Sequence, residues 1–302
     1  MQEGKLCNTS TITLRDQIAR HFASLSPQLR LAARYVSDHP EEVATRSLRQ
    51  VASRSGLTPP TYSRLARAIG FAQYEGLRDS CRKELRQSRL SLADRAALLQ
   101  KPDENNPKEG RGSFAAIHAH SAVSGIQRLL DEMDIGQLAE VVDQLIAAKN
   151  VYLIGSLCGR TMVEYLAYMT QMVTPNWRVV GQGASSASGI LTGAGENDVL
   201  IAIAAAPYAS ETVRAVQLVA DSGTGANIIV ITDDLLSPLL KHARYSFLIS
   251  AESSHFFPSH VALVTFLEIL TGMIVRRLGE EGQKRINAVE QSSHAIGDYW
   301  QQ

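Results

Sequence analysis

The chain of 302 residues has little cysteine and no apolar run long enough to cross a membrane. Its three cysteines, Cys7, Cys81 and Cys158, are widely spaced and odd in number, which fits neither a disulfide framework nor a zinc cluster. The apolar stretch at residues 261–275 is too short for a bilayer and contains Glu268. The first residues lack the apolar core of a signal peptide. We therefore expect a soluble, cytoplasmic protein with reduced thiols.

The chain also has no formal net charge, because 30 Lys and Arg balance 30 Asp and Glu, but these charges are unevenly distributed along the sequence. Residues 1–100 contain 16 Lys and Arg against 9 Asp and Glu, a net charge of +7, and the remaining residues carry −7. A basic module joined to an acidic one indicates an anionic partner for the first module, and nucleic acid is the commonest such partner. The alternative is a solvated arginine-rich face, which charge alone does not exclude.

Helix signals dominate the first hundred residues. Ser47 and Gln50 form the pattern of a capping box at the start of one short helix, and Gly56 stands just past its end, where a left-handed cap belongs. Thr58 and Pro59 are typical of the N-cap and first position of the next helix. A longer helix is predicted upstream, in SPQLRLAARYVSDHP. Two short helices separated by the turn SGLT are typical of a helix-turn-helix.

The apolar spacing predicts which side chains of this motif face inward: Val51 and Ala52 on the first helix, Leu57 in the turn, and Leu65 and Ile69 on the second helix. In a helix-turn-helix, the N-terminal end of the second helix enters the major groove. Arginine bonds to phosphate oxygens or guanine edges, and the hydroxyl side chains contact the backbone or thymine methyls. The candidate DNA-contacting residues are Ser47, Thr58, Pro60, Thr61, Tyr62, Ser63, Arg64 and Arg67. The alternative is a helical hairpin with a merely polar outer face.

A change of pattern follows a polar segment rich in proline and glycine at residues 101–113, which predicts a linker. Two helices are expected next, and beyond residue 150 five short apolar runs alternate with helical segments. This alternation predicts a five-stranded parallel sheet covered on both faces, in which ligands bind where the strands end. His118 and His120, spaced i, i+2, do not share a helix face, so we expect no metal site, and no cofactor is expected.

Residues 47–78, SLRQVASRSGLTPPTYSRLARAIGFAQYEGLR, resemble the helix-turn-helix of the RpiR family of bacterial transcription regulators. Residues 151–279 resemble a SIS (sugar isomerase) domain. The two domains in this order, with a linker between them, cover nearly the whole chain. The resemblance implies an all-α helix-turn-helix domain at 10–90, a linker at 91–113, an α/β SIS domain with a five-stranded, doubly wound parallel sheet at 114–285, and a tail at 286–302.

The same resemblance implies a regulator rather than an enzyme. It would bind an operator in double-stranded DNA as a homodimer or homotetramer, and respond to a sugar, sugar acid or sugar phosphate through the SIS domain. Two alternatives stay open: a SIS-type isomerase, or a SIS scaffold that only oligomerises. Glu252, His255 and His260 fall near strand ends, where sugar isomerases of this fold carry a general base, but without a phosphate anchor they do not complete a catalytic site.

The ligand motifs depart from the family pattern. Sugar-phosphate SIS domains present Gly-x-Gly-Ser-Ser after the first strand, where this chain has GSLCG at residues 155–159. After the third strand they present Ser-x-Ser-Gly-x-Thr, where this chain has AAAPYA at residues 204–209. Alanine supplies no side-chain donor and Pro207 lacks an N–H group, and each lost hydrogen bond to a charged ligand weakens binding by about 1.5–3 kcal/mol. We expect a changed ligand.

Three interpretations of this altered loop stay open. The pocket takes a neutral or carboxylate-bearing metabolite, it takes a phosphate through other groups such as Arg160 or the serines of GASSASG, or it binds no ligand. The aromatic ring of Tyr208 can stack on a sugar ring or seal the pocket. The candidate effector-binding residues are Gly155, Ser156, Cys158, Arg160, Ser185, Ser186, Ser188, Tyr208, Ser210, Glu211 and His255.

Overall fold

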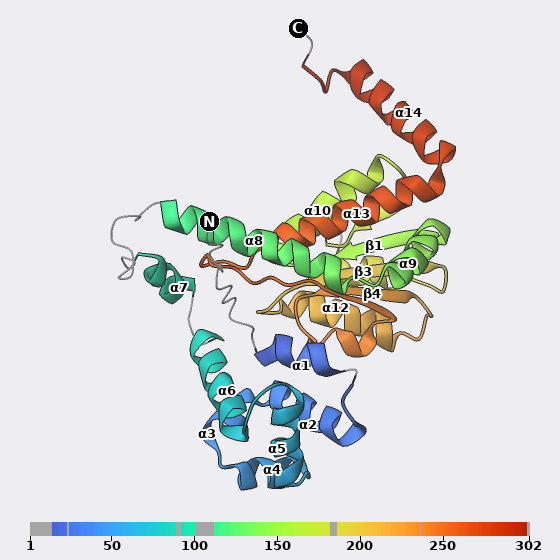
Figure 1. Cartoon of the computed structure of the whole chain (residues 1–302). Helices are drawn as coiled ribbons and strands as arrows, with labels where there is room; N and C mark the ends of the chain where they lie inside the picture. Colours follow the sequence, from blue (N-terminus) through green and yellow to red (C-terminus); the bar gives the residue numbers. More distant parts are fainter. Residues whose placement is uncertain are drawn as a thin grey trace. The chain divides into compact units, whose positions relative to one another are not determined.

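The computed structural model divides into two compact units, residues 1–100 and 101–302, which are described separately (Figure 1). The structure describes residues 14–22, 24–88, 92–100, 112–181, 186–235 and 237–300. Ser185 and residues 101–111 of the expected linker lie outside the described residues. None of the described helices combines the length and the apolar composition needed to span a lipid bilayer.

The first unit is built from helices, as predicted. They are α1 (Leu14–Phe22), α2 (Pro27–Asp38), α3 (Pro40–Thr45), α4 (Leu48–Ser55), α5 (Pro59–Ala68), α6 (Tyr74–Ser88) and α7 (Leu92–Leu99). Val51 of α4, Leu65 of α5 and Leu77 of α6 are fully buried in one apolar core. Helix α7 occupies part of the segment that was expected to be linker, and its described side chains are not buried. Part of the segment predicted to be linker is thus helical.

Local sequence signals set the limits of α4 and α5. The Ser47 N–H donates to Gln50 Oε1 (3.0 Å) and the Gln50 N–H donates to Ser47 Oγ (3.4 Å), which completes the predicted capping box. Gly56 adopts φ of 69° at the C-cap, a conformation that an L side chain rarely takes. Pro59 begins α5. The N–H group of the first residue of a helix has no carbonyl partner within the helix, so a proline at this position loses no hydrogen bond. The predicted helix-turn-helix is confirmed.

The second unit is an α/β structure with an all-parallel sheet. Its strands, β1 (Asn150–Ile154), β2 (Trp177–Val179), β3 (Asp198–Ala204), β4 (Asn227–Thr232) and β5 (Tyr245–Leu248), have the order β2-β1-β3-β4-β5. Its helices are α8 (Gly112–Glu132), α9 (Ile135–Ala147), α10 (Cys158–Gln171), α11 (Ala187–Leu191), α12 (Ser210–Asp221), η1 (Leu240–His242), α13 (Val261–Leu278) and α14 (Glu280–Ile296). The predicted five-stranded parallel sheet is confirmed.

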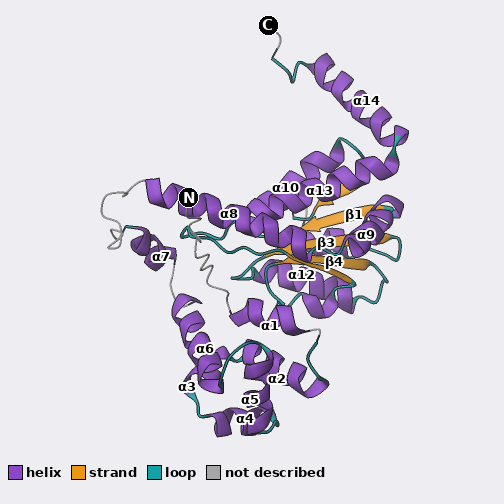
Figure 2. Ribbon diagram, in the orientation of Figure 1, coloured by secondary structure: helices purple, strands orange, loops and turns teal. Residues whose placement is uncertain are grey.

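Helices cover both faces of the sheet, as Figure 2 shows, and alternate strand residues join different cores. Leu153 and Ile201 join a core with α9, α10 and α13, whereas Leu200 and Val230 join a second core with α11 and α12. Burial on both faces explains why the strands read as continuous apolar runs rather than alternating ones. The segment expected to be a tail from residue 286 is largely helical, because α14 runs to Ile296.

Candidate functional site

Helix α5 presents a polar face to solvent at its N-terminal end. Thr58 and Pro60 are exposed, and Thr61 is half-buried with its hydroxyl 2.9 Å from that of Thr58. Ser63 is also half-buried and donates a hydrogen bond to the Pro59 carbonyl (3.4 Å). Ser47 is exposed but engaged in the cap of α4. These residues stand where the second helix of a helix-turn-helix meets its target.

The two arginines of α5 have no acidic partner in the described part of the chain. Arg64 and Arg67 are exposed, and neither forms an ion pair with any residue that the structure describes. Other arginines of this unit differ: Arg54 pairs with Glu42 (2.8 Å) and Arg82 pairs with Asp79 (2.9 Å). The outer face of α5 therefore keeps its positive charge available for an external anion.

Tyr62 is a correction to the sequence analysis, because it is fully buried and cannot contact DNA. Its ring packs edge-on against the rings of Tyr35 and Tyr74, with both centroid distances at 6.3 Å. Burial raises the pKa of Tyr62 to about 12, although Ser55 opposes this shift. Tyr62 precedes Leu65 and Ile69 by three and seven residues, so the helical period of the core face already contained this position.

In the second unit, the polar groups that remain in the altered loops bond to one another. The Ser156 hydroxyl donates to Glu211 Oε2 (2.8 Å) and accepts from the Thr212 hydroxyl (3.1 Å). Ser210, the first residue of α12, is exposed. The carboxylate of Glu211 in the first turn of α12 also interacts favourably with the positive end of that helix. Because the Ser156 hydroxyl already donates to the Glu211 carboxylate, this network leaves few hydrogen-bond donors for a phosphate.

Other polar residues expected at the ligand site form hydrogen bonds within the protein. The Arg160 guanidinium donates to Glu164 Oε1 (2.6 Å) and to the carbonyls of Val180 and Gly181 (both 3.2 Å). Ser186 caps α11 by accepting from the Gly189 N–H group (3.1 Å), and its hydroxyl is 3.3 Å from that of Ser188. The prediction that these groups hold a phosphate gains no support from their contacts.

Glycine is required at two positions around the start of α10. A Cβ atom on Gly155 would lie 2.6 Å from the Gly159 carbonyl oxygen, and one on Gly159 would lie 2.7 Å from the Ile203 carbonyl oxygen. These approaches let α10 pack directly on the end of β3. Between them, Leu157 adopts φ of 55° and ψ of −128°, with its side chain 71% exposed. The family pattern has glycine at this position. This chain has leucine there, in a backbone conformation that glycine adopts more easily.

Replacing Leu157 with glycine should therefore stabilise the second unit by about 1 kcal/mol, because a positive φ costs a branched residue about 1–3 kcal/mol and glycine loses part of this gain as entropy. The measurement is denaturant unfolding followed by the fluorescence of Trp177, which is buried in this unit. Leu218→Gly is the matched control: Leu218 is an exposed leucine within α12 and should lose about 0.8 kcal/mol. A similar loss in both variants would contradict the expectation.

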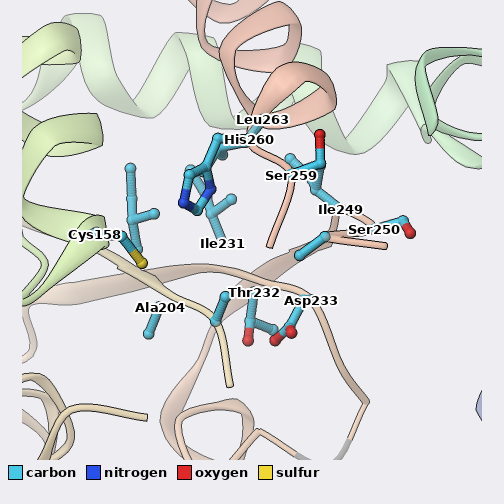
Figure 3. Close-up of a pocket in the computed structure, with 14 residues that line it drawn as sticks. Cys158, Ala204, Ile231, Thr232, Asp233, Ile249, Ser250, Ser259, His260 and Leu263 are labelled. Atoms are coloured by element: carbon cyan, nitrogen blue, oxygen red, sulfur yellow. The ribbon is translucent and has the colours of Figure 1, made fainter. Parts of the chain in front are cut away.

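A pocket lies where β3, β4 and β5 end, and Figure 3 draws its 14 lining residues and labels ten of them. Its walls are largely apolar. The polar or polarisable side chains that line it are Cys158, Thr232, Asp233, Ser250, Ser259 and His260. Of the expected effector-binding residues, only Cys158 lines this pocket.

Asp233 is held in place by groups below the pocket. The Ala206 N–H group is 3.2 Å from both carboxylate oxygens, and the Tyr208 hydroxyl donates to Oδ1 (3.2 Å). Burial raises the pKa of Asp233, and the bond from Ala206 opposes this shift. Tyr208 therefore positions an acid rather than stacking on a ligand from within the pocket.

His260 enters the pocket from the start of α13. Its Nε2 atom is buried and makes no hydrogen bond within the described part of the chain. Burial lowers the pKa of His260, and the nearby Asp233 opposes this shift. Of Asp233 and His260, the sequence analysis noted only His260 near a strand end, and it included neither among the ligand residues. Their positions at the end of β4 and before α13 were the available signal.

His255 is placed away from this pocket, contrary to expectation. Its ring packs on Phe256 (4.3 Å between centroids) and lies 5.7 Å from the ring of His118 on α8. Glu252 pairs with Arg128 of α8 (2.9 Å). These contacts anchor the loop before α13 on α8. No group of three metal-ligating side chains occurs in the part of the chain that the structure describes.

Known proteins resemble both units. The family model for the SIS domain matches residues 144–275. An uncharacterised HTH-type transcriptional regulator of Clostridium perfringens is 20% identical over 262 residues, which cover 83% of this chain and 88% of that protein. A second such regulator, from Haemophilus influenzae, is 22% identical over 240 residues, or 76% of this chain and 77% of its own.

Two solved structures share the fold. The Vibrio vulnificus NanR protein complexed with ManNAc-6P has a TM-score of 0.56 at 17% identity, covering 94% of this chain and 99% of its own. The sugar isomerase domain of an RpiR transcription factor from Sphaerobacter thermophilus has a TM-score of 0.55 at 17% identity, covering 59% of this chain and 98% of its own. The C-terminal unit thus contains a SIS domain, and most of the chain is similar to HTH-type transcriptional regulators.

Proposed function

We propose that this protein binds operator DNA through α5 and that a carbohydrate-derived ligand in its SIS domain sets its affinity for that DNA. The observation that carries the first part is the outer face of α5, where Arg64 and Arg67 are exposed and pair with no acidic residue that the structure describes. Guanidinium groups on the outer face of such a helix bond to phosphate oxygens and guanine edges. The expected DNA contacts are thus Ser47, Thr58, Pro60, Thr61, Ser63, Arg64 and Arg67.

We further propose that the protein acts as a homodimer or homotetramer, because two reading helices must stand about 34 Å apart to enter successive turns of one DNA face. The helix-turn-helix domain would span residues 10–90, and the SIS domain, from residue 114, would bind the effector and oligomerise. A role on DNA places the protein in the cytoplasm of a bacterium. The SIS fold alone does not imply turnover, and the closed network of Ser156 and Glu211 supports sensing rather than isomerase chemistry.

The test is a selection of binding sites from random duplex DNA with the full chain, followed by affinity measurements over a salt series. We expect one enriched sequence with two half-sites, bound at least about 1,000-fold more tightly than random duplex. The logarithm of the affinity should fall linearly with that of the salt concentration, by about 0.9 for each phosphate contacted. Equal affinity for all duplexes would contradict the proposal.

A further inference from the structure

We propose that the outer face of α13 is the surface on which a second copy of this chain docks, with the two α13 helices antiparallel about a two-fold axis at Gly272. This surface would be the interface of the proposed homo-oligomer, so the proposal rests on that part of the proposed function. Three features support it: the open space around Gly272, the two opposite charges placed on either side of it, and the contacts of the neighbouring helix α10.

Helix α13 lies on the same side of the sheet as α8 and α10, and one of its faces packs into the core there (Figure 1). Phe266, Leu270 and Ile274 on that inner face are at most 2% exposed. The outer face is formed by residues that recur every three or four positions and therefore line up along one side of the helix. They are Val261, Thr265, Glu268, Gly272 and Arg276, and all but Thr265 are exposed.

Gly272 stands within this outer face, well inside the helix. A Cβ atom on Gly272 would meet no atom of a neighbouring element of the described chain within 4 Å, so packing within the chain does not require glycine here. Glycine is also the poorest helix former after proline. On an exposed helix face it lets a second helix come close, because the distance between two packed helices depends on the side chains at their contact. Gly272 therefore suits the point of closest approach between two copies of α13.

Two opposite charges lie at equal distances from Gly272. Glu268 precedes it by four residues and Arg276 follows it by four, which is about 6 Å along the helix axis in each direction. Neither side chain pairs with an opposite charge among the residues that the structure describes. A two-fold interface must be complementary to itself. In an antiparallel pair centred on Gly272, Glu268 of one copy lies opposite Arg276 of the other, and this pair forms twice, whereas a parallel pair would bring like charges together.

Helix α10 extends this surface. The Tyr165 hydroxyl donates to Glu268 Oε1 (2.7 Å), which holds the carboxylate in place beside α10. Three residues further along α10, the side chain of Tyr168 is 73% exposed. Tyrosine is enriched in protein interfaces, where its ring contributes apolar contact area. The surface therefore offers a second copy an exposed aromatic ring as well as complementary charge.

The first test measures the association of the full chain by sedimentation velocity over a range of concentrations. Gly272→Leu should weaken association by about tenfold or more, because a leucine at the point of closest approach forces the two helices apart. The fold should be kept, since the added side chain meets no neighbouring element of the described chain, and circular dichroism checks this. Gln217→Leu is the matched control. It adds the same side chain at an exposed position of α12, on the other side of the sheet, and should leave association unchanged (Figure 1).

The second test reverses the charges. Glu268→Arg and Arg276→Glu should each weaken association by about tenfold, because each brings like charges together across the two-fold axis. The double variant restores opposite charges with their places exchanged, and its association should return to within about threefold of that of the parent protein. The recovery cannot come from a contact within one chain, since the two positions are about 12 Å apart along the helix. Arg214→Glu, at an exposed position of α12, is the matched control and should leave association unchanged.

A parent chain that is monomeric at every concentration measured overturns the proposal. Unchanged association in Gly272→Leu, or a double charge variant that associates no better than the single ones, does the same. The selection of operator DNA is a separate measurement. A chain that selects an operator and assembles through another surface contradicts this interface but supports the proposed function, whereas a chain whose variants dissociate as expected but which selects no DNA sequence does the opposite. The two proposals therefore fail separately.

Discussion

Arg64→Ala should lower operator affinity by about 10- to 100-fold, because losing a bidentate contact to a base or phosphate costs about 1–3 kcal/mol. In a dimer the substitution acts on both reading helices, so the combined loss is expected to abolish detectable binding at moderate salt. The protein should stay folded, since Arg64 is exposed and pairs with no acid in the described chain. The measurement is fluorescence anisotropy on the selected operator at fixed salt, with circular dichroism as the check on folding.

Arg214→Ala is the matched control for this substitution. Arg214 is an exposed arginine on α12 of the second unit, so its removal changes the net charge equally but touches no proposed DNA contact. We expect operator affinity to stay within about twofold of that of the parent protein, because a distant exposed charge acts only through a screened field. Equal losses in both variants would indicate that only overall charge matters, and unchanged affinity in Arg64→Ala would show that the wrong face of α5 was chosen.

Tyr62→Ala should destabilise the first unit by about 3–5 kcal/mol, the range for removing a large aromatic side chain from a packed core. The ring is fully buried between Tyr35 and Tyr74, so its loss leaves a cavity that helices α2, α5 and α6 surround. The two tryptophans, Trp177 and Trp300, both lie in the second unit. Tryptophan fluorescence should therefore report an unchanged transition of that unit, while circular dichroism shows an earlier loss of helix.

Tyr62→Phe separates packing from DNA contact. The variant keeps the ring and should keep both the stability of the first unit and operator affinity, because the hydroxyl group is buried away from solvent. The sequence alone had placed Tyr62 among the DNA contacts. Normal stability with a marked loss of operator affinity in Tyr62→Phe would restore that interpretation.

The sequence by itself indicated the helix-turn-helix, the parallel sheet and their order along the chain, but it placed α7 in a linker and the end of α14 in a tail. The capping box at Ser47 and Gln50, the left-handed Gly56 and the proline at position 59 act within one turn of chain, so their effect can be read without the fold. Five apolar runs between helical segments sufficed for a parallel sheet, because strands buried on both faces need no polar side. The loss of serines from the loop after β3 was equally visible.

Only the tertiary structure decided what the individual polar side chains do. Ser156 meets Glu211 across 55 positions of sequence, and Tyr208 meets Asp233 across 25. Arg160 had been a candidate ligand-binding residue, yet it bonds to Glu164 and to the Val180 carbonyl just after β2. Tyr62 shows the same limit, since a tyrosine on a helix suits either face until neighbouring helices cover one of them. Helix caps and strand patterns depend on residues that are close in sequence. The charge of a pocket and the hydrogen-bonding groups left free in it depend on which side chains bond to residues distant in sequence.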